Sequence, residues 1–263
     1  MAIPWVLLRW EVEYLEHVLE GRTRPLVLRC AQLGATQNPV RRSLVVKAVG
    51  LPEVTRTSLI RELLGNMLAR ELGVHTATPA LVEIDAEMAN ALNVSLSAKG
   101  LRLEPGTAVG CTYLRPLLPV AGDLPEPAAT EVPRLYGFDL AVQNPDRRVD
   151  NPNCALFENQ LLAYDFEMAF SFLMLIGSTL EAWEVSRHGI AARHLFLPRL
   201  RGKKPNWQPL LDALRALTGE RLDALIELLP PTWRGDMTGV RVHLMSLLGA
   251  LQAFETELQE TVT

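Results

Sequence analysis

The sequence has no apolar run long enough to cross a membrane. Its longest nearly uninterrupted apolar stretch, Met168 to Gly177, holds about ten residues including Ser171, whereas a membrane-spanning helix needs roughly twenty. The start carries no basic leader with a cleavable small-residue site, because Glu11 and Glu13 closely follow the apolar patch of Met1 to Leu8. These absences exclude a transmembrane protein and argue against export.

An excess of positive charge is also missing. The chain has 26 Lys and Arg residues against 30 Asp and Glu residues, which gives a formal net charge of -4. Dedicated nucleic-acid-binding domains usually carry a strongly basic face that displaces counterions from phosphates. The one local exception is a basic cluster that we interpret as a solvated loop; it consists of Arg199, Arg201, Lys203 and Lys204. We therefore expect no dedicated nucleic-acid binding.

Cysteine is scarce. The three cysteines, Cys30, Cys111 and Cys154, are odd in number, far apart and without CxxC spacing, so neither a disulfide framework nor a zinc site is indicated. Reduced thiols in a cytoplasmic protein are the simplest interpretation. Apolar residues, in contrast, make up 48% of the 263 residues, enough for one large core or for two modest ones.

The first third of the chain predicts strands around one long helix. Two short runs rich in β-branched residues, Val27 to Arg29 and Ser43 to Val49, are typical of strands joined by a polar loop. Thr57 or Ser58 can cap a helix that runs to about Leu72 and stops at Gly73. The further elements that we expect are a strand at Ala80 to Ile84, a short helix at Ala86 to Leu92 and a strand at Thr107 to Leu114.

A proline-rich connector follows, with five prolines between Pro116 and Pro133, and we place a lobe boundary there. Residues 1–115 then form a β-rich N-lobe and residues 116–263 a helical C-lobe. The expected helices are Val132 to Gln143, one or two between Leu180 and Leu197, Pro209 to Leu217 closed by Gly219, Glu220 to Leu229, and a long final helix. The final helix has an apolar seam from Met237 to Leu258, which could contact a protein partner, although packing onto its own lobe is favoured.

The segment from Asn144 to Glu167 carries the most chemistry. A polar Asp/Asn loop leads into an apolar run, a turn and a second apolar run, which predicts a β-hairpin that ends in a carboxylate. We expect this hairpin to bring Asp146, Asn151 and Asp165 together. Phosphoryl transfer needs such a set, because a carboxylate orients the attacking hydroxyl and two hard oxygen ligands hold Mg²⁺.

Two alternatives remain open for this loop. Asp146 and Asn151 could be turn and capping residues, since both residue types favour turns by hydrogen bonding to their own backbone. Asn153 is an alternative to Asn151 as a metal ligand, although the five-residue spacing from Asp146 favours Asn151.

The spacing Asp146-x-x-x-x-Asn151, followed by Asp165, resembles the catalytic loop and metal-binding Asp of the protein-kinase-like fold. The form NPDRRVDNPN is similar to that of the HipA-like kinases and their phosphatidylinositol 3/4-kinase relatives. Upstream, SLVVKAVG, LIRELLGNMLARELGV and PALVEID resemble the family's strand with an ATP-binding Lys, its helix with an acidic partner and its next strand. The likeness covers Pro25 to Phe170 well and the rest only loosely. It implies an α+β fold with two lobes, a small β-rich N-lobe with one long helix and a mainly helical C-lobe.

The resemblance also implies a role for each site residue. Asp146 would be the catalytic base. A Lys between Val46 and Ala48 in a strand needs a counter-charge to stay ionised in a cleft, which agrees with the family's pairing. The other implied roles are Asn151 and Asp165 as Mg²⁺ ligands, Lys47 on the nucleotide phosphates with Glu62 as its ion-pair partner, and Gly110, Cys111, Thr112 and Tyr113 as a hinge that binds the adenine edge.

Two departures from the family pattern bear on activity. After Asp165 the chain has Phe166 and Glu167, where protein kinases have Phe-Gly and many HipA-like chains have His-Gly. Between Leu26 and Lys47 there is no Gly-x-Gly-x-x-Gly. Backbone amides near Gly34 to Asn38, or at the helix start near Thr57 and Ser58, could hold the phosphates instead.

The leading hypothesis is therefore a kinase that uses ATP and Mg²⁺ to transfer the γ-phosphoryl group to a hydroxyl, with protein Ser or Thr as the first choice of acceptor. A lipid or small-molecule acceptor is an alternative. A second alternative, prompted by Glu167 and the missing glycine loop, is a weak or inactive nucleotide-binding or scaffolding module on the same fold.

Overall fold

The computed structural model describes residues 6–34, 38–174 and 180–263. The chain divides into two compact units. The first comprises Met1–Leu63 and Ala77–Arg115, and the second comprises Leu64–Thr76 and Pro116–Thr263. The first unit is rich in strands, and the described residues contain eight α-helices in all, so the α+β class is confirmed.

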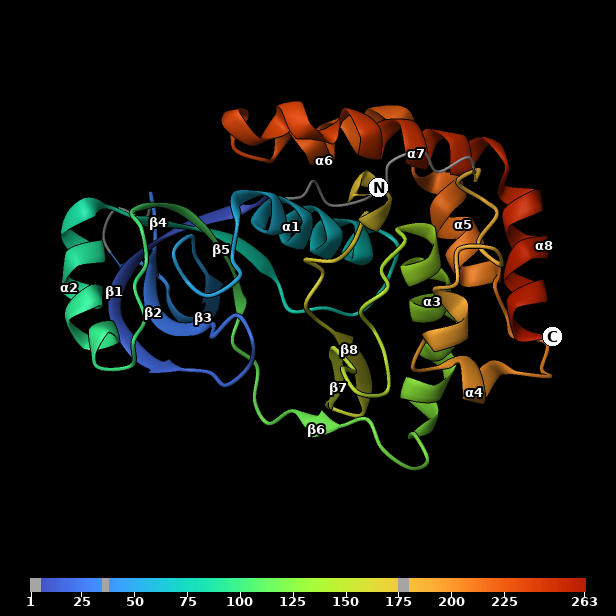
Figure 1. Ribbon diagram of the computed structural model, residues 1–263, viewed down its shortest axis with the longest axis horizontal. Coiled ribbons are helices and arrows are strands. Elements are labelled where there is room, and N and C mark those ends of the chain that lie inside the picture. The colour runs from blue at the N-terminus through green and yellow to red at the C-terminus, as the bar shows by residue number, and fades with distance from the viewer. Residues whose placement is uncertain (1–5, 35–37, 175–179) are drawn as a thin grey trace. The chain divides into compact units, whose positions relative to one another are not determined.

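Five strands of the first unit form a closed barrel in the order β1-β2-β3-β5-β4 (Figure 1). The strands are β1 (Leu8–Val18), β2 (Leu26–Gln32), β3 (Arg41–Lys47), β4 (Pro79–Ile84) and β5 (Gly106–Thr112). The barrel closes where β1 runs parallel to β4, with Leu8 opposite Ala80. The other pairs are antiparallel, and β5 lies between β3 and β4, so Gly110 faces Val46 on one side and Ala80 on the other.

The strand β1 was not expected from the sequence, although its pattern predicts it in retrospect. Trp10 and Val12 are buried while Arg9 and Glu11 are exposed, which is the period of two that a half-buried strand produces. The expected short helix is α2 (Ala86–Ser97), five residues longer than expected. Asp85 caps it by accepting a hydrogen bond of 2.8 Å from the N–H of Met88.

The helix α1 (Arg56–Glu71) has the expected extent, but its cap differs from the expectation. Thr55, not Thr57 or Ser58, precedes the helix, and its Oγ1 accepts from the N–H of Ser58 at 3.1 Å. Ser58 Oγ in turn accepts from the N–H of Thr55 at 2.9 Å, so the two residues satisfy each other's backbone donors. Gly73 ends the segment with φ of +75°, as expected for a helix stop.

The hairpin of the second unit agrees with the sequence. Strands β7 (Cys154–Phe157) and β8 (Gln160–Ala163) pair antiparallel, and the edge strand β6 (Leu118–Pro119) joins β7. Glu158 and Asn159 form the tight turn with φ of 51° and 65°.

Helices are the main regular elements of the second unit, and α3, α5 and α8 lie side by side (Figure 1). The helices are α3 (Glu126–Ala141), α4 (Leu197–Leu200), α5 (Gln208–Ala216), α6 (Gly219–Glu227), α7 (Thr238–Gly249) and α8 (Leu251–Val262). Short 3₁₀ turns occupy Ser171–Met174, Ala191–Arg193 and Pro231–Met237.

Three helix predictions need correction. The helix α3 begins at Glu126, inside the proline-rich connector, because Pro127 in a first turn gives up an N–H that has no helical partner there. The segment from Leu180 to Leu197 is not helical beyond the turn at Ala191–Arg193. Gly219 does not close α5 but begins α6, with Thr218 as its cap.

The prediction of one long final helix is also wrong, because the helix is interrupted between α7 and α8. Ala250 has φ of −128°, outside the helical range. The apolar seam is nevertheless buried on both sides of the break, so it packs within the chain. Its fully buried members are Val240, Leu244, Leu247, Phe254 and Leu258.

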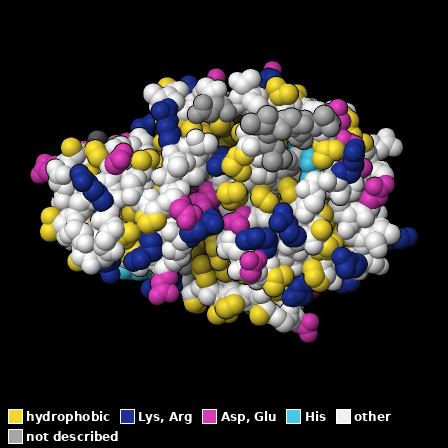
Figure 2. All heavy atoms as spheres, viewed as in Figure 1, with side chains coloured by type: hydrophobic (Ala, Val, Ile, Leu, Met, Phe, Trp, Pro, Cys, Tyr) yellow, Lys and Arg dark blue, Asp and Glu magenta, His cyan; other side chains and the backbone are white. Residues whose placement is uncertain are grey.

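None of the helices among the described residues is both long enough and apolar enough to span a bilayer. Acidic and basic side chains are interspersed on the face of the molecule drawn in Figure 2. Three members of the basic cluster, Arg201, Lys203 and Lys204, are exposed in the loop after α4, which agrees with a solvated loop.

Candidate active site

Lys47 and Glu62 form a buried ion pair in the first unit. Lys47 is the last residue of β3 and lies opposite Val109 of β5, while Glu62 lies on α1. The Nζ of Lys47 is 3.1 Å from the Oε2 of Glu62, and the two side chains are only 11% and 12% exposed. A nearby carboxylate keeps a buried ammonium group charged, so the strand and the helix together hold a charged Lys in place.

The expected hinge coincides with the end of β5. The N–H of Thr112 donates to the carbonyl of Thr78 at 3.0 Å, and the N–H of Tyr113 donates to the carbonyl of Ser43 at 3.0 Å. Both donors are therefore used within the first unit. An adenine edge bound to this segment would have to form hydrogen bonds with backbone groups other than these two N–H groups.

The expected phosphate-binding amides are only partly described. Residues 35–37 of the segment from Gly34 to Asn38 lie outside the described residues. At the start of α1, the N–H of Ser58 is engaged by Thr55. The source of phosphate-binding amides stays a prediction.

Asp146 is held by two amide side chains of its own loop. The Nδ2 of Asn151 donates to its Oδ2 at 2.8 Å, and the Nδ2 of Asn153 donates to the same oxygen at 3.2 Å. On the other side, Oδ1 lies 3.6 Å from the Nη2 of Arg148. The structure thus brings Asp146 and Asn151 together and adds Asn153, the alternative ligand, to the same cluster.

A turn and a cap shape this loop. The N–H of Arg148 donates to the carbonyl of Asn151 at 2.9 Å, and the N–H of Asn151 returns a bond of 3.2 Å to the carbonyl of Arg148. Asn144 Oδ1 accepts from the N–H of Asp146 at 3.2 Å. The loop is therefore closed on itself, and its side chains hold the Asp146 carboxylate in one orientation.

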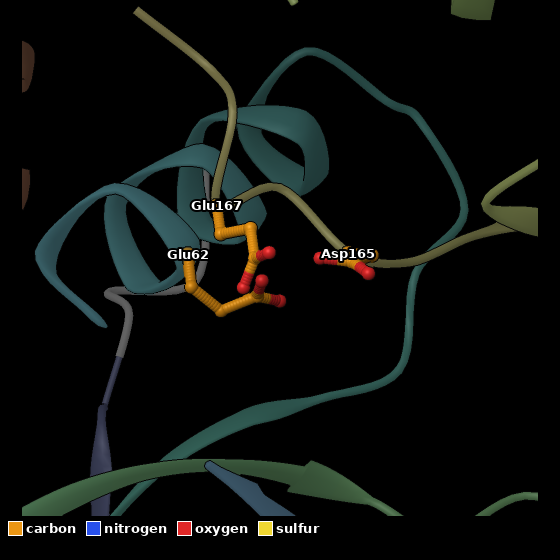
Figure 3. A group of neighbouring side chains, drawn as sticks. All are labelled: Glu62, Asp165 and Glu167. Carbon is orange, nitrogen blue, oxygen red and sulfur yellow. The ribbon is translucent and has the colours of Figure 1, made fainter. Parts of the chain in front are cut away.

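Asp165 and Glu167 lie two residues apart, just after β8. Their carboxylate oxygens come within 4.8 Å of each other, and Phe166 between them is fully buried. Figure 3 shows both side chains projecting from this segment, and Glu62 projecting from α1. Asp165 has φ of 61°, a left-handed conformation that is uncommon for residues other than glycine and that Asp tolerates.

The donor chemistry of the second unit fits a divalent cation. Carboxylate oxygens of Asp165 and Glu167 and the amide oxygen of Asn151 are the hard ligands that Mg²⁺ prefers. Two carboxylates this close repel each other unless a cation offsets their charge. Asp165 and Glu167 could therefore hold a metal ion together.

A family model described as HipA-like kinase matches residues 13–257. This chain belongs to the HipA-like kinase family. No curated protein matches it significantly. The family prediction is confirmed, and the match extends well past Phe170, so the helices of the second unit are part of what the family shares.

As a HipA-like kinase, the chain belongs to a family of phosphotransferases. Membership of this family implies the use of ATP and a divalent metal. The individual roles of Lys47, Glu62, Asp146, Asn151 and Asp165 stay predictions. Lys47 lies with Glu62 in the first unit, and Asp146 lies with Asn151 in the second.

The sequence did not single out three buried polar residues of this HipA-like kinase. Asp139 on α3, Arg147 next to Asp146, and His194 are all nearly inaccessible to solvent. A signal for Asp139 exists, because it is the one carboxylate in the apolar second half of α3. Arg147 belongs to the motif itself, whereas His194 lies outside it.

Proposed function

We propose that this HipA-like kinase uses ATP and Mg²⁺ to transfer the γ-phosphoryl group to the hydroxyl of a protein Ser or Thr. The observation that carries the proposal is the geometry at Asp146, whose Oδ2 accepts from the amides of both Asn151 and Asn153. The Asp146 side chain remains 12% exposed. A carboxylate held in one direction and reached by solvent suits a catalytic base.

In the proposed reaction, Asp146 accepts the proton of the acceptor hydroxyl as the acceptor oxygen bonds to the γ-phosphorus. The bond between the γ-phosphorus and the β,γ-bridging oxygen breaks, and ADP leaves. Asn151 and Asp165 offer oxygen ligands, and Lys47 neutralises charge on the nucleotide phosphates. Bound Mg²⁺ would offset the negative charge that the phosphates bring to these carboxylates.

Transfer from γ-labelled ATP tests the proposal. The wild-type chain, D146N and D150N would be incubated with ATP, Mg²⁺ and Ser/Thr-containing protein, with EDTA as the metal-free control. Asp150 is the matched control, because it lies in the same loop but its side chain is 76% exposed. We expect D146N to lose about 100-fold or more of the transfer rate, the range for a general base, and D150N to keep it.

Equal rates for D146N and wild type would show that Asp146 is not the base. Parallel reactions with lipid vesicles and with small hydroxyl compounds test the acceptor class. Transfer only to one of these would overturn the protein Ser or Thr assignment and retain the kinase.

A second candidate function is nucleotide binding without turnover, favoured by Glu167 beside Asp165. An extra carboxylate could hold the metal and nucleotide too firmly or misalign them. Because a ligand that binds only the folded state raises its stability, thermal unfolding with ATP, with and without Mg²⁺, reports binding. Stabilisation without any transfer, hydrolysis or self-phosphorylation would favour this second function.

A further inference from the structure

Asp139 is a fully buried carboxylate with four hydrogen bonds. Its Oδ2 accepts from the Nε of Arg147 at 2.5 Å and from the Nε2 of His194 at 3.1 Å. Its Oδ1 accepts from the Nδ2 of Asn144 at 3.0 Å and from the Nη2 of Arg147 at 3.3 Å. The side chains of Asp139 and Arg147 are both 0% exposed, so the ion pair lies in the interior of the second unit.

The hydrogen bonds of His194 show that it is neutral. A backbone N–H can only donate, and the N–H of Phe196 donates to the Nδ1 of His194 at 3.1 Å. The proton of the ring therefore resides on Nε2, which donates to Asp139. The cluster then carries one negative charge on Asp139 and one positive charge on Arg147, and the two balance.

The remaining donors of Arg147 reach both parts of the candidate site. Its Nη1 donates to the carbonyl of Asn153 and, at 3.5 Å, to the carbonyl of Tyr164. The N–H of Tyr164 also donates to the Asn153 carbonyl at 3.0 Å. Arg147 lies with its guanidinium carbon 5.6 Å from the centre of the Phe166 ring. One guanidinium group thus contacts Asn153, which binds Asp146, and the residues on either side of Asp165.

Stability alone does not account for this ion pair. Removing two charges from water costs so much that apolar residues often replace a buried pair without loss of stability. Arginine, however, offers a planar fork of fixed donors that a lysine or an apolar side chain lacks. Here the guanidinium donors of Arg147 hold the backbone carbonyls of Asn153 and Tyr164 in place. The ion pair therefore fixes the geometry of the loop.

We propose that Arg147, held by Asp139, is a positioning residue that aligns the base Asp146 through Asn153 and the metal-binding Asp165 through Tyr164 and Phe166. The proposal rests on the proposed kinase function. It assigns no contact with substrate to Arg147, because that side chain is inaccessible to solvent.

Two variants separate positioning from folding. R147K keeps the charge and removes the fork. The double variant D139N/R147M removes both charges together, and the amide that replaces the Asp139 carboxylate keeps an oxygen that can accept from His194. The matched control is E71Q/R221M, which removes another ion pair of the second unit, with distances of 2.6 and 2.9 Å between Arg221 and Glu71.

The first measurement is hydrogen exchange, which does not depend on activity. We expect the amides of Asn151 and Tyr164 to exchange at least about tenfold faster in both Arg147 variants than in wild type, because local opening becomes easier. The control should leave these two amides unchanged. Unchanged exchange in the Arg147 variants would overturn the proposal.

The second measurement is steady-state transfer at saturating Mg²⁺. We expect kcat to fall about 100-fold, the effect of misplacing a catalytic group by about 1 Å, while KM for ATP changes less than about threefold, because ground-state binding is retained. Loss of transfer in proportion to the unfolded fraction, with normal kcat per folded molecule, would also overturn the proposal. A wild-type chain without transfer would refute the proposed function, whereas the exchange rates would still show whether Arg147 fixes the loop.

Discussion

A Cβ added at Gly65 would lie 2.7 Å from the Cβ of Phe166. Gly65 lies in the second half of α1, and Phe166 stands between Asp165 and Glu167. The same added atom would come within 3.4 Å of the Cβ of Ala169. The helix therefore packs directly against the segment that carries the two carboxylates. A side chain at position 65 would push the helix and this segment apart.

We expect G65A to destabilise the chain and to displace Asp165. Replacing a helical Gly by Ala normally stabilises by about 0.5–1 kcal/mol, but overpacking a filled core costs about 1–3 kcal/mol. The clash involves a Cβ, which cannot move without its backbone, so the free energy of unfolding should fall by about 1–2 kcal/mol. Urea unfolding measures the change.

Gly249 provides the matched control. It is the last residue of α7, and a Cβ added there would meet nothing within 4 Å. G249A should leave the free energy of unfolding unchanged or raise it by up to about 1 kcal/mol. Equal effects of G65A and G249A would mean that the close approach of α1 to Phe166 does not limit packing.

Local patterns predicted the elements that hold the site. The hairpin was predictable because its turn at Glu158 and Asn159 separates two short apolar runs. The pairing of Lys47 with Glu62 followed from a strand residue that needs a counter-charge and a family resemblance that supplied one. In contrast, the break at Ala250 could not be predicted from apolar spacing, because the buried positions continue on both sides of it.

The buried cluster of Asp139, Arg147 and His194 could not be predicted for a different reason. Asp139 is eight residues from Arg147 but 55 residues from His194 in the sequence. Their contact depends on how α3 packs against His194, which follows the turn at Ala191–Arg193 in a segment for which longer helices were wrongly expected. Residue types and their spacing were enough to predict a phosphoryl-transfer motif, whereas the packing around it required the structure.

We expect K47M to remove most of the transfer activity. Loss of one group that stabilises developing charge typically costs about 100-fold or more in kcat, and Lys47 is proposed to act on the nucleotide phosphates. The variant should also show less thermal stabilisation by ATP than wild type. Labelled-ATP transfer and thermal unfolding measure the two effects.

K99M is the matched control, because Lys99 is exposed in the turn after α2. It should retain both transfer and stabilisation by ATP. If K47M behaved like K99M, the nucleotide would have to be bound elsewhere, and the ion pair with Glu62 would be a feature of the barrel and α1 alone.

The neutral state of His194 makes stability depend on pH. Burial, the largest effect, lowers the pKa of His194 below its ordinary value of 6.5, despite the hydrogen bond to Asp139. As the pH falls below 6.5, the unfolded chain therefore binds a proton that the folded chain does not, and the free energy of unfolding decreases. The loss ends once the pH is below the pKa of the folded state.

Asp139 adds a second pH range, below that of His194, over which the free energy of unfolding decreases. Burial opposes its charged form, but the guanidinium of Arg147 and the hydrogen bond from His194 outweigh burial and hold the pKa of Asp139 below 3.8. Its contribution to stability is complete above pH 3.8 and is lost as the pH falls through the folded-state pKa. The two residues therefore act in the same direction over different ranges.

H194Q tests the effect of His194 on stability below pH 6.5. A Gln side chain can donate to Asp139 and accept from the N–H of Phe196, but it does not titrate. We expect the free energy of unfolding of wild type, measured in urea between pH 7.5 and 5, to decrease more steeply than that of H194Q, by up to about 1.4 kcal/mol per pH unit, the limit for one proton. His188 and His243 also have lowered pKa values through burial, so H194Q should keep part of the slope. An identical slope in the two proteins would contradict a neutral, buried His194 bound to Asp139.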